Sequence, residues 1–260
     1  MRGVTAAARL HAPSGRTVLI LGATSAIARA VAREFAGRGY DLLLAGRDPE
    51  ELGRVAADLA VRYGVKVEAR PFDALALESH EAFVEACRES SGNSLKGAVL
   101  FLGYLGDQSV AQKDPAEAKR ILDTNFLAPV SILSLLANSF EEKREGFLCA
   151  LSSVAGDRGR QSNYVYGAAK AGLSIFLQGL RNRLFRSGVR VITIKPGFVD
   201  TAMTFGRPGM FLVASPEKVG EHIVQAILKG RDQAYVPRFW RPVMLLIRLI
   251  PERIFKRMRL

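Results

Sequence analysis

The chain has 260 residues, of which 48% are hydrophobic and 24% are charged. This composition excludes a disordered chain and a collagen-like repeat, and the length lets one globular domain bury its core without a disulfide or metal staple. Lys and Arg number 37 against 25 acids, a formal net charge of +12, of which +3 lies in residues 1–16 and +6 in residues 236–260. A nearly balanced body with basic ends argues against a nucleic-acid partner.

Cysteine usage and hydropathy bear on the compartment. Cys87 and Cys149 lie far apart without metal-ligand companions, which predicts two buried thiols in a reducing compartment and no metal site. No N-terminal apolar run is long enough for a secretory signal, and none elsewhere approaches the about 18–20 residues of a membrane span. We therefore expect a cytoplasmic protein.

Short, nearly continuous apolar runs alternate with longer amphipathic segments along the body of the chain. This alternation predicts an α/β fold, a single Rossmann-type doubly wound parallel sheet with helices on both faces. We expect one domain over residues 1–235, loose at 1–15, which a basic amphipathic tail extends over 236–260. The predicted strands are Thr17–Leu21, Asp41–Ala45, Val65–Ala69, Ala98–Leu102, Gly146–Ser152, Val189–Lys195 and one around Tyr235, and the predicted helices span 26–38, 49–63, 76–90, 115–140, 163–187 and 216–229.

The first predicted strand runs into a turn of small residues, Leu21–Ala28, that opens a helix. Backbone N–H groups and the positive end of a helix can hold a phosphate there, although a tight connection without a ligand is the alternative. The spacing resembles the Thr-Gly-x-x-x-Gly-x-Gly turn of the short-chain dehydrogenase/reductase family, with Ala26 and Ala28 in place of two glycines. The resemblance implies cofactor contacts from Gly22, Thr24, Ser25, Ala26 and Ile27.

Two later positions concern the rest of a dinucleotide. Arg47 follows the second strand, where an acid would bind a ribose 2′-hydroxyl and an arginine would pair with a 2′-phosphate. Arg47 therefore favours NADP(H), with NAD(H) as the alternative cofactor and a solvated surface arginine as the alternative for the side chain. In the family an Asp after the third strand binds the adenine amino group, and the resemblance assigns that role to Asp73.

The strongest pattern joins Ser153, Tyr166 and Lys170. Tyr166 and Lys170 are four residues apart in a predicted helix and so share one face, one turn apart. A phenol titrates near ~10, and a close ammonium should lower the pKa of Tyr166 and make it an effective general acid. Ser153, at a strand end thirteen residues before Tyr166, could bind the reacting carbonyl oxygen. The order of these residues matches the family's Ser…Tyr-x-x-x-Lys arrangement.

The resemblance implies roles for further residues. Asn125 is similar to a helical Asn that positions Lys170 through a water; the alternative is a satisfied polar helix residue. Residues 196–201 resemble the family's Pro-Gly-x-Val-x-Thr, which holds the nicotinamide, whereas its Asn-Asn-Ala-Gly is replaced by Leu100–Gly103. The implied cofactor contacts are Gly103, Tyr166, Lys170, Pro196, Gly197, Val199 and Thr201.

We expect the loop between Ser153 and Tyr166, together with the tail, to determine which substrate binds. Arg158 and Arg160 could pair with a phosphate, with solvated arginines as the alternative, and Tyr164 is a third substrate candidate. Residues 238–260 place apolar and basic residues at helical spacing. They predict contact with an anionic membrane at its inner face, or packing against the sheet or a second subunit.

Several segments, among them Phe72–Leu75 and Leu105–Asp107, resemble the decaprenylphosphoryl-2-keto-pentose reductases. This subgroup implies that hydride from NADPH reduces the 2-keto group of a polyprenylphosphoryl pentose, giving decaprenylphosphoryl-arabinose for cell-wall synthesis. It also implies a flavoenzyme partner that makes the keto sugar, while the wider family implies a homo-oligomer. The alternatives are a reductase of a soluble ketone, acyl chain or sterol, and a cofactor-binding scaffold without turnover.

Overall fold

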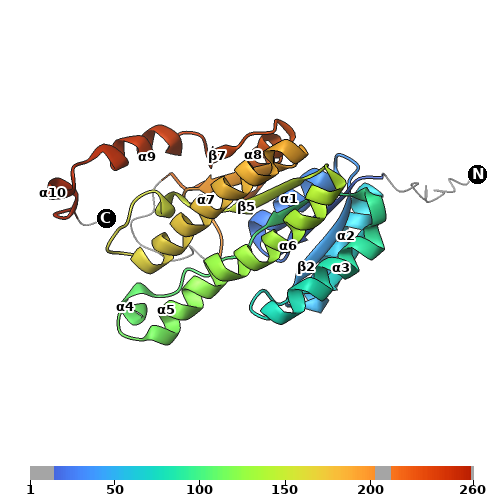
Figure 1. The fold of residues 1–260 in the computed structure, drawn as a ribbon, viewed down its shortest axis with the longest axis horizontal. Coiled ribbons are helices and arrows are strands. Elements are labelled where there is room, and N and C mark those ends of the chain that lie inside the picture. The colour runs from blue at the N-terminus through green and yellow to red at the C-terminus, as the bar shows by residue number, and fades with distance from the viewer. Residues whose placement is uncertain (1–14, 203–211, 259–260) are drawn as a thin grey trace, which may run out of the picture.

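The computed structural model describes residues 15–202 and 212–258. Seven parallel strands form one sheet in the order β3-β2-β1-β4-β5-β6-β7 (Figure 1). The predicted doubly wound sheet is confirmed, with strand ends shifted by a few residues. The strands are β1 Thr17–Leu21, β2 Asp41–Gly46, β3 Val67–Pro71, β4 Leu95–Leu100, β5 Phe147–Leu151, β6 Arg190–Pro196 and β7 Gln233–Val236.

Helices cover both faces of the sheet. Local signals set their ends: the Asp48 carboxylate accepts a hydrogen bond from Glu51 N, and Gly64 ends the same helix in the left-handed region. The helices are α1 Ala26–Ala36, α2 Pro49–Tyr63, α3 His80–Ser91, α4 Gln108–Ala111, α5 Pro115–Leu122, α6 Ala128–Lys143, α7 Tyr164–Leu184, α8 Pro216–Leu228, α9 Trp240–Leu249 and α10 Glu252–Phe255.

The predicted helix 115–140 is interrupted. Residues Asp123–Leu127 form a π-helical turn between α5 and α6, so the two helices are joined by one wider turn rather than by a continuous α-helix. The interruption includes Asn125, whose side chain takes over part of the backbone hydrogen bonding, as described below.

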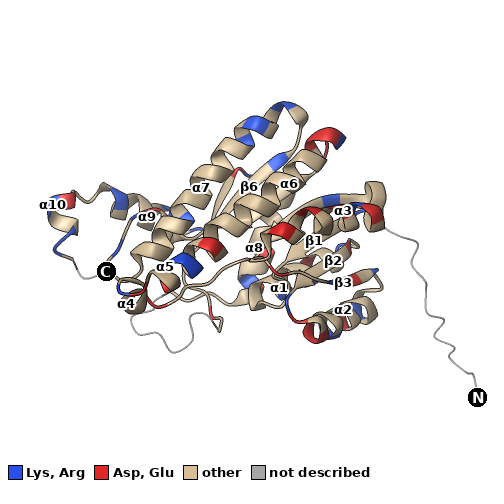
Figure 2. Ribbon diagram, turned by 60° about the horizontal axis from the view of Figure 1, so that its bottom comes forward, with Lys and Arg blue, Asp and Glu red and all other residues tan. Residues whose placement is uncertain are grey.

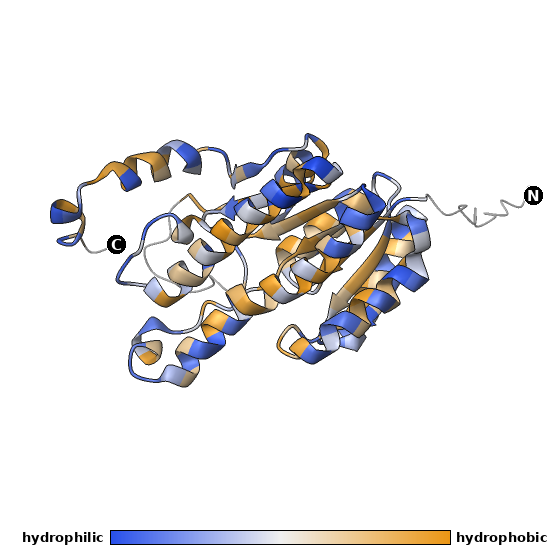
Figure 3. Cartoon of the chain, viewed as in Figure 1, coloured by the Kyte–Doolittle hydropathy of each residue, from blue (hydrophilic) through white to orange (hydrophobic). Residues whose placement is uncertain are grey.

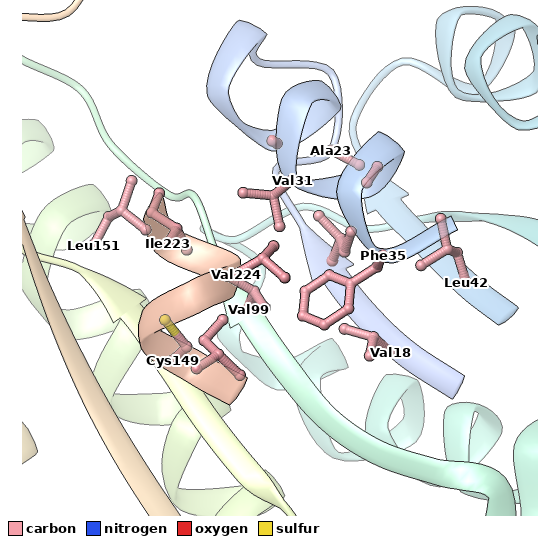
Figure 4. Packing of buried hydrophobic residues seen from close by; sticks show 14 of the residues in the cluster. Val18, Ala23, Val31, Phe35, Leu42, Val99, Cys149, Leu151, Ile223 and Val224 are labelled. Carbon is pink, nitrogen blue, oxygen red and sulfur yellow. The ribbon is translucent and has the colours of Figure 1, made fainter. Parts of the chain in front are cut away.

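Strand residues alternate between two cores, because both faces of the sheet are covered. In β1, Val18 and Ile20 join the core beneath α1, α2 and α8, whereas Leu19 and Leu21 join the core beneath α3, α6 and α7. Figure 4 shows the first core, in which Phe35 of α1 lies near Val18 and Val99. This two-sided burial explains the nearly continuous apolar runs in the sequence.

One helical stretch of the described chain, Pro115–Lys143, is long and apolar enough to cross a membrane by length and composition. The expectation that no segment would come near a membrane span is therefore wrong on composition. However, Ile132, Leu133 and Leu136 of α6 are buried in the second core. Burial of this kind is typical of a core helix.

The tail is helical on both sides of Pro251, as predicted. Helices α9 and α10 extend along one end of the molecule (Figure 1). Trp240 and Met244 are buried with Val154, so this part of the tail packs on the domain. Both cysteines, Cys87 and Cys149, are free and buried.

Candidate active site

The carboxyl ends of the central strands surround a pocket of about 360 Å³. It lies where the strand order reverses between β1 and β4, the place where open α/β sheets bind ligands. Six of the predicted cofactor residues, from four separate segments, share this pocket. They are Gly22, Thr24, Ser25, Arg47, Asp73 and Gly103.

The turn after β1 brings its backbone close to the neighbouring strand. Gly22 has a φ of +75°, and an added Cβ would lie 2.9 Å from Phe101 O, so a side chain would be strained there. Ser25 accepts a hydrogen bond from Ala28 N at 3.3 Å and caps α1. Of the alanines that replace family glycines, Ala28 is buried in the core and Ala26 is exposed at the first helical turn. Only the Ala26 methyl thus faces outward at this turn.

One side of the pocket contains Arg47 and Asp73, the two charged residues predicted to bind the adenosine half of a dinucleotide. Arg47 is exposed directly after β2 and has no ion-pair partner in the part of the chain that the structure describes. Asp73 Oδ1 accepts a hydrogen bond from Leu75 N at 3.0 Å, which fixes the carboxylate. Arg120 and Thr124 complete the wall. They were not predicted, because they lie within a helix without a recognisable motif.

Ser153, Tyr166 and Lys170 come together at the end of β5. Tyr166 is in the first turn of α7, and Lys170 lies one turn farther along the same helix. The Ser153 side chain lies close enough to Tyr166 to act on the phenol, and its Oγ accepts a hydrogen bond from Ala155 N at 3.1 Å. Lys170 Nζ donates to Leu151 O at 3.0 Å and to Leu102 O at 3.3 Å. The predicted arrangement of hydroxyl, phenol and amine is therefore present.

Burial controls the titration of these groups. Loss of solvation raises the pKa of Tyr166 to about 12, opposed by the hydrogen bond from Ser153. Loss of solvation lowers the pKa of Lys170 to about 7, and its Nζ lies 5.7 Å from the centre of the Tyr166 ring. The expectation of a lowered pKa for Tyr166 is wrong for this structure, because desolvation by burial outweighs the opposing effect of Ser153.

Contacts behind the site hold Ser153 against α7. The neighbouring Ser152 Oγ donates to Lys170 O at 2.8 Å and lies 2.7 Å from Ser174 Oγ. An added Cβ on Gly156 would lie 2.8 Å from Ala171 N, so the turn after Ser153 packs directly on the helix backbone. Sequence reasoning missed Ser152 and Ser174, since serines in a strand and a helix carry no distinctive signal.

Asn125 acts on the backbone rather than on Lys170 directly. Its Nδ2 donates to Tyr104 O at 2.6 Å and to Ile121 O at 2.8 Å, and its Oδ1 accepts from Tyr104 N at 3.2 Å. Because Lys170 binds Leu102 O, Asn125 and Lys170 hold the same stretch after β4 at points two residues apart. The water-mediated link between Asn125 and Lys170 stays a prediction.

The segment after β6 lies beside the tail. Pro196 and Val199 are buried, and Gly197 N donates to Val236 O at 3.0 Å. An added Cβ on Gly197 would overlap the indole of Trp240. No local sequence pattern indicates that Trp240 covers this segment. Thr201 is half-buried at the end of the described segment.

The three substrate candidates have different surroundings. Arg158 Nη2 lies 2.7 Å from Glu252 Oε2, its Nη1 donates to Arg248 O at 3.1 Å, and its guanidinium lies 4.2 Å from the Phe255 ring centre. Arg158 thus binds the tail. Arg160 has no such partner within residues 15–202 and 212–258, and Tyr164 is exposed at the start of α7.

The chain is similar to known proteins along most of its length. Residues 16–208 match the family model described as short chain dehydrogenase. An uncharacterized oxidoreductase of Mycobacterium tuberculosis is 38% identical over 241 residues, which are 93% of this chain and 96% of the relative. An uncharacterized oxidoreductase of Streptomyces coelicolor is 36% identical over 244 residues, which are 94% of this chain and 96% of the relative.

Solved structures share the fold. A short-chain dehydrogenase from Sphingobium yanoikuyae in complex with NADPH has a TM-score of 0.77 at 26% identity, with 91% of this chain and 97% of that chain covered. An NAD⁺-bound xylitol dehydrogenase has a TM-score of 0.73 at 18% identity, with 81% and 91% covered. The first of these structures contains NADPH and the second NAD⁺.

Proposed function

The chain belongs to the short-chain dehydrogenase family, and we propose that it reduces a ketone to a secondary alcohol with a nicotinamide cofactor. The observation that carries this proposal is the convergence of Ser153 and Tyr166, which interact at the end of β5, with the buried Lys170 one helical turn from Tyr166. The strained Gly22 turn and the pocket beside it fit such a cofactor, since they leave space where a side chain would otherwise lie. When bound, the cofactor supplies the hydride.

The side chains divide the remaining chemistry. The Ser153 hydroxyl donates to the substrate carbonyl oxygen and stabilises the charge that develops on it. Tyr166, whose pKa is raised to about 12 by burial, carries its proton at neutral pH and donates it to the developing alkoxide. Lys170, with a pKa lowered to about 7 by burial, can give and take a proton near neutral pH. It is thus suited to restore the proton on Tyr166.

The preferred cofactor in this proposal is NADP(H). Arg47 has no ion-pair partner among the described residues and lines the same pocket as Ser25, so its guanidinium is available to a 2′-phosphate. Gly46 offers no carboxylate to a 2′-hydroxyl, which leaves NAD(H) as the weaker alternative.

Tyr166→Phe tests the chemistry. We expect turnover of ketones with NADPH to fall about 10²- to 10⁴-fold, because the proton donor is lost, while NADPH binding measured by fluorescence is unchanged. Tyr63→Phe, on α2, is the matched control. Residual activity within a few-fold of the parent protein would refute the role of Tyr166. A chain that binds NADPH or NADH saturably but reduces no ketone would instead support the scaffold alternative.

As the substrate, we propose a polyprenylphosphoryl pentose with a 2-keto group, which would be reduced during cell-wall synthesis. Its support is the resemblance in sequence together with the basic loop beside Tyr166. This substrate would need a flavoenzyme partner that oxidises the corresponding alcohol. A soluble ketone, an acyl chain or a sterol is the competing substrate. NADPH oxidation with a ketone panel that includes a polyprenylphosphoryl keto-pentose separates these possibilities.

The tail supports a peripheral position on the cytoplasmic face of an anionic membrane. Its outer side chains Leu245, Leu246 and Leu249 are 57%, 67% and 69% exposed, and the stretch is apolar in Figure 3 and basic at intervals in Figure 2. Arg241 precedes Leu245 by one turn and also lines a hollow of about 720 Å³ that contains Lys229, Arg231 and Arg238. Apolar and cationic groups on one helix suit an anionic lipid surface. A second subunit of a homo-oligomer is the competing occupant.

A further inference from the structure

Three polar side chains around the start of α7 have buried atoms that nothing in the described chain pairs. These atoms are Nε and Nη2 of Arg160, Nε2 of Gln108 and Oδ1 of Asn163. Buried polar groups in proteins are almost always hydrogen-bonded, because an unpaired one has lost its water without compensation. Several such atoms on residues around one helical turn leave hydrogen-bonding capacity there that the described residues do not use.

Hydrogen bonds hold the three residues around one turn. Asn163 N donates to Arg160 O at 3.2 Å, and Gly167 N donates to Asn163 O at 2.8 Å. Gln108 reaches the same turn from α4, since its Oε1 accepts from Val165 N at 3.0 Å. Tyr166 belongs to this turn. The residues with unpaired atoms are therefore anchored to the turn that carries the proposed proton donor.

The two loop arginines, Arg158 and Arg160, differ in whether an acidic side chain already pairs with the guanidinium. Arg158 is neutralised by Glu252 of the tail. For Arg160, Asp157 is the acid that acts on it electrostatically. That carboxylate already binds Lys195 Nζ at 2.5 Å and accepts from Tyr235 Oη at 2.7 Å. Burial lowers the pKa of Arg160, and the charge of Asp157 offsets only part of that decrease. The guanidinium of Arg160 is thus partly buried without an anion of its own.

We propose that Arg160, Gln108 and Asn163 form the subsite that binds an anionic group of the substrate, a phosphate ester, together with an adjacent hydroxyl. This inference rests on the proposed function, because it assigns the bound group to the ketone that Tyr166 protonates. Two N–H groups of a guanidinium match two oxygens of a phosphate. The Gln108 amide donates and the Asn163 oxygen accepts, which together complement a hydroxyl. A sugar phosphate or a lipid-linked sugar phosphate has this chemistry.

Binding can be measured without turnover. The protein is first saturated with NADP⁺, which occupies the Arg47 end of the cleft, and is then titrated calorimetrically with ribose 5-phosphate and with ribose. We expect the phosphate to be bound at least about tenfold more tightly than the neutral sugar, as a hydrogen-bonded ion pair provides. Arg160→Ala should remove that difference, Arg160→Lys should keep part of it, and Gln108→Glu should reduce it through repulsion.

Arg62→Ala, on the outer side of α2, is the control and should bind ribose 5-phosphate like the parent protein. No preference for the phosphate, or equal affinity in Arg160→Ala, overturns the proposal. Farnesylphosphoryl ribose distinguishes the sources: tighter binding than ribose 5-phosphate assigns the subsite to a lipid headgroup, and equal binding assigns it to a free sugar phosphate. A protein that binds the phosphate through Arg160 but reduces no ketone refutes the proposed function and leaves the anion site standing.

Discussion

Asp157 and Lys195 form an ion pair that is almost fully withdrawn from water. Lys195 Nζ lies 2.5 Å from Asp157 Oδ1, with side chains only 7% and 3% exposed, respectively. Tyr235 Oη donates to the other carboxylate oxygen at 2.7 Å. The pair connects the loop four residues after Ser153 to β6 and β7. It therefore joins the segments on either side of the proposed reaction site.

Asp157→Asn should destabilise the fold strongly. Breaking a buried pair leaves the Lys195 ammonium without a counter-charge, which costs about 3–5 kcal/mol. Urea unfolding measures the loss. Asp232→Asn is the control, since its carboxylate is 78% exposed and lies 3.5 Å from Arg181, where pairs contribute about 0–1 kcal/mol. Similar losses in both variants would contradict the importance of the buried pair.

Arg47→Ala should change the cofactor preference. Loss of an ion-paired hydrogen bond to the 2′-phosphate is expected to weaken NADPH binding about 10- to 100-fold and to leave NADH binding nearly unchanged. Fluorescence titration of both cofactors gives the ratio. Arg54→Ala is the control, because the guanidinium that this variant loses is paired with Glu51 in the parent protein. A parallel weakening of both cofactors would remove Arg47 from 2′-phosphate recognition.

Lys170 should make stability depend on pH. Burial lowers its pKa from 10.5 to about 7, so between these values the unfolded chain binds a proton that the folded chain lacks. Stability from this group therefore rises as pH increases through that window, and its burial penalty is greatest below pH ~7. Between pH ~7 and ~9.5 the parent protein should gain about 3 kcal/mol relative to Lys170→Met.

Urea unfolding at several pH values within that window provides the comparison. Lys218→Met, a change at an exposed position of α8, is the control and should give a curve parallel to the parent protein. If the free energy of unfolding of Lys170→Met changes with pH in parallel with that of the parent protein, Lys170 retains its ordinary pKa in the folded state.

The exposed apolar side of the tail should bind anionic vesicles. We expect the parent protein to float with phosphatidylglycerol vesicles but not with phosphatidylcholine vesicles, since each surface arginine contributes about 1 kcal/mol with anionic lipid. Glutamate at Leu245, Leu246 and Leu249 should abolish flotation without unfolding, because these positions are exposed. Val61→Glu, at an 89% exposed position of α2, is the control. A loss of oligomer mass in the triple variant, without any flotation of the parent, would assign this surface to a second subunit.

Most of the sheet and much of the site could be predicted from the sequence, because local patterns encode them. Continuous apolar runs follow from burial on both faces, as in β1. Gly22, Arg47 and Asp73 could be placed because each follows a predicted strand, and parallel strands end at the same edge of a sheet. The order of strands and motifs is therefore enough to predict where the pocket lies.

The remaining features depend on contacts between distant segments. Arg158 and Glu252 are 94 residues apart, and no local pattern predicts that the tail neutralises this arginine. The lowered pKa predicted for Tyr166 was wrong for a similar reason, since the spacing to Lys170 gives proximity but not the degree of burial. The contact between Trp240 and Gly197 is a second example of distant segments that meet.

The π-helical turn at Asp123–Leu127 has a consequence for engineering and for the alignment of homologues. It is one residue longer than an α-helical turn would be. The side chains of α6 are therefore rotated about the helix axis relative to the positions that a continuous α-helix would give them. Deleting a single residue here would restore a regular helix but rotate α6 by about 100° relative to α5. Either Thr124 would then leave the nucleotide pocket or Leu133 would leave the core. Chimeras that exchange helices between relatives should therefore keep both helices and the turn as one unit.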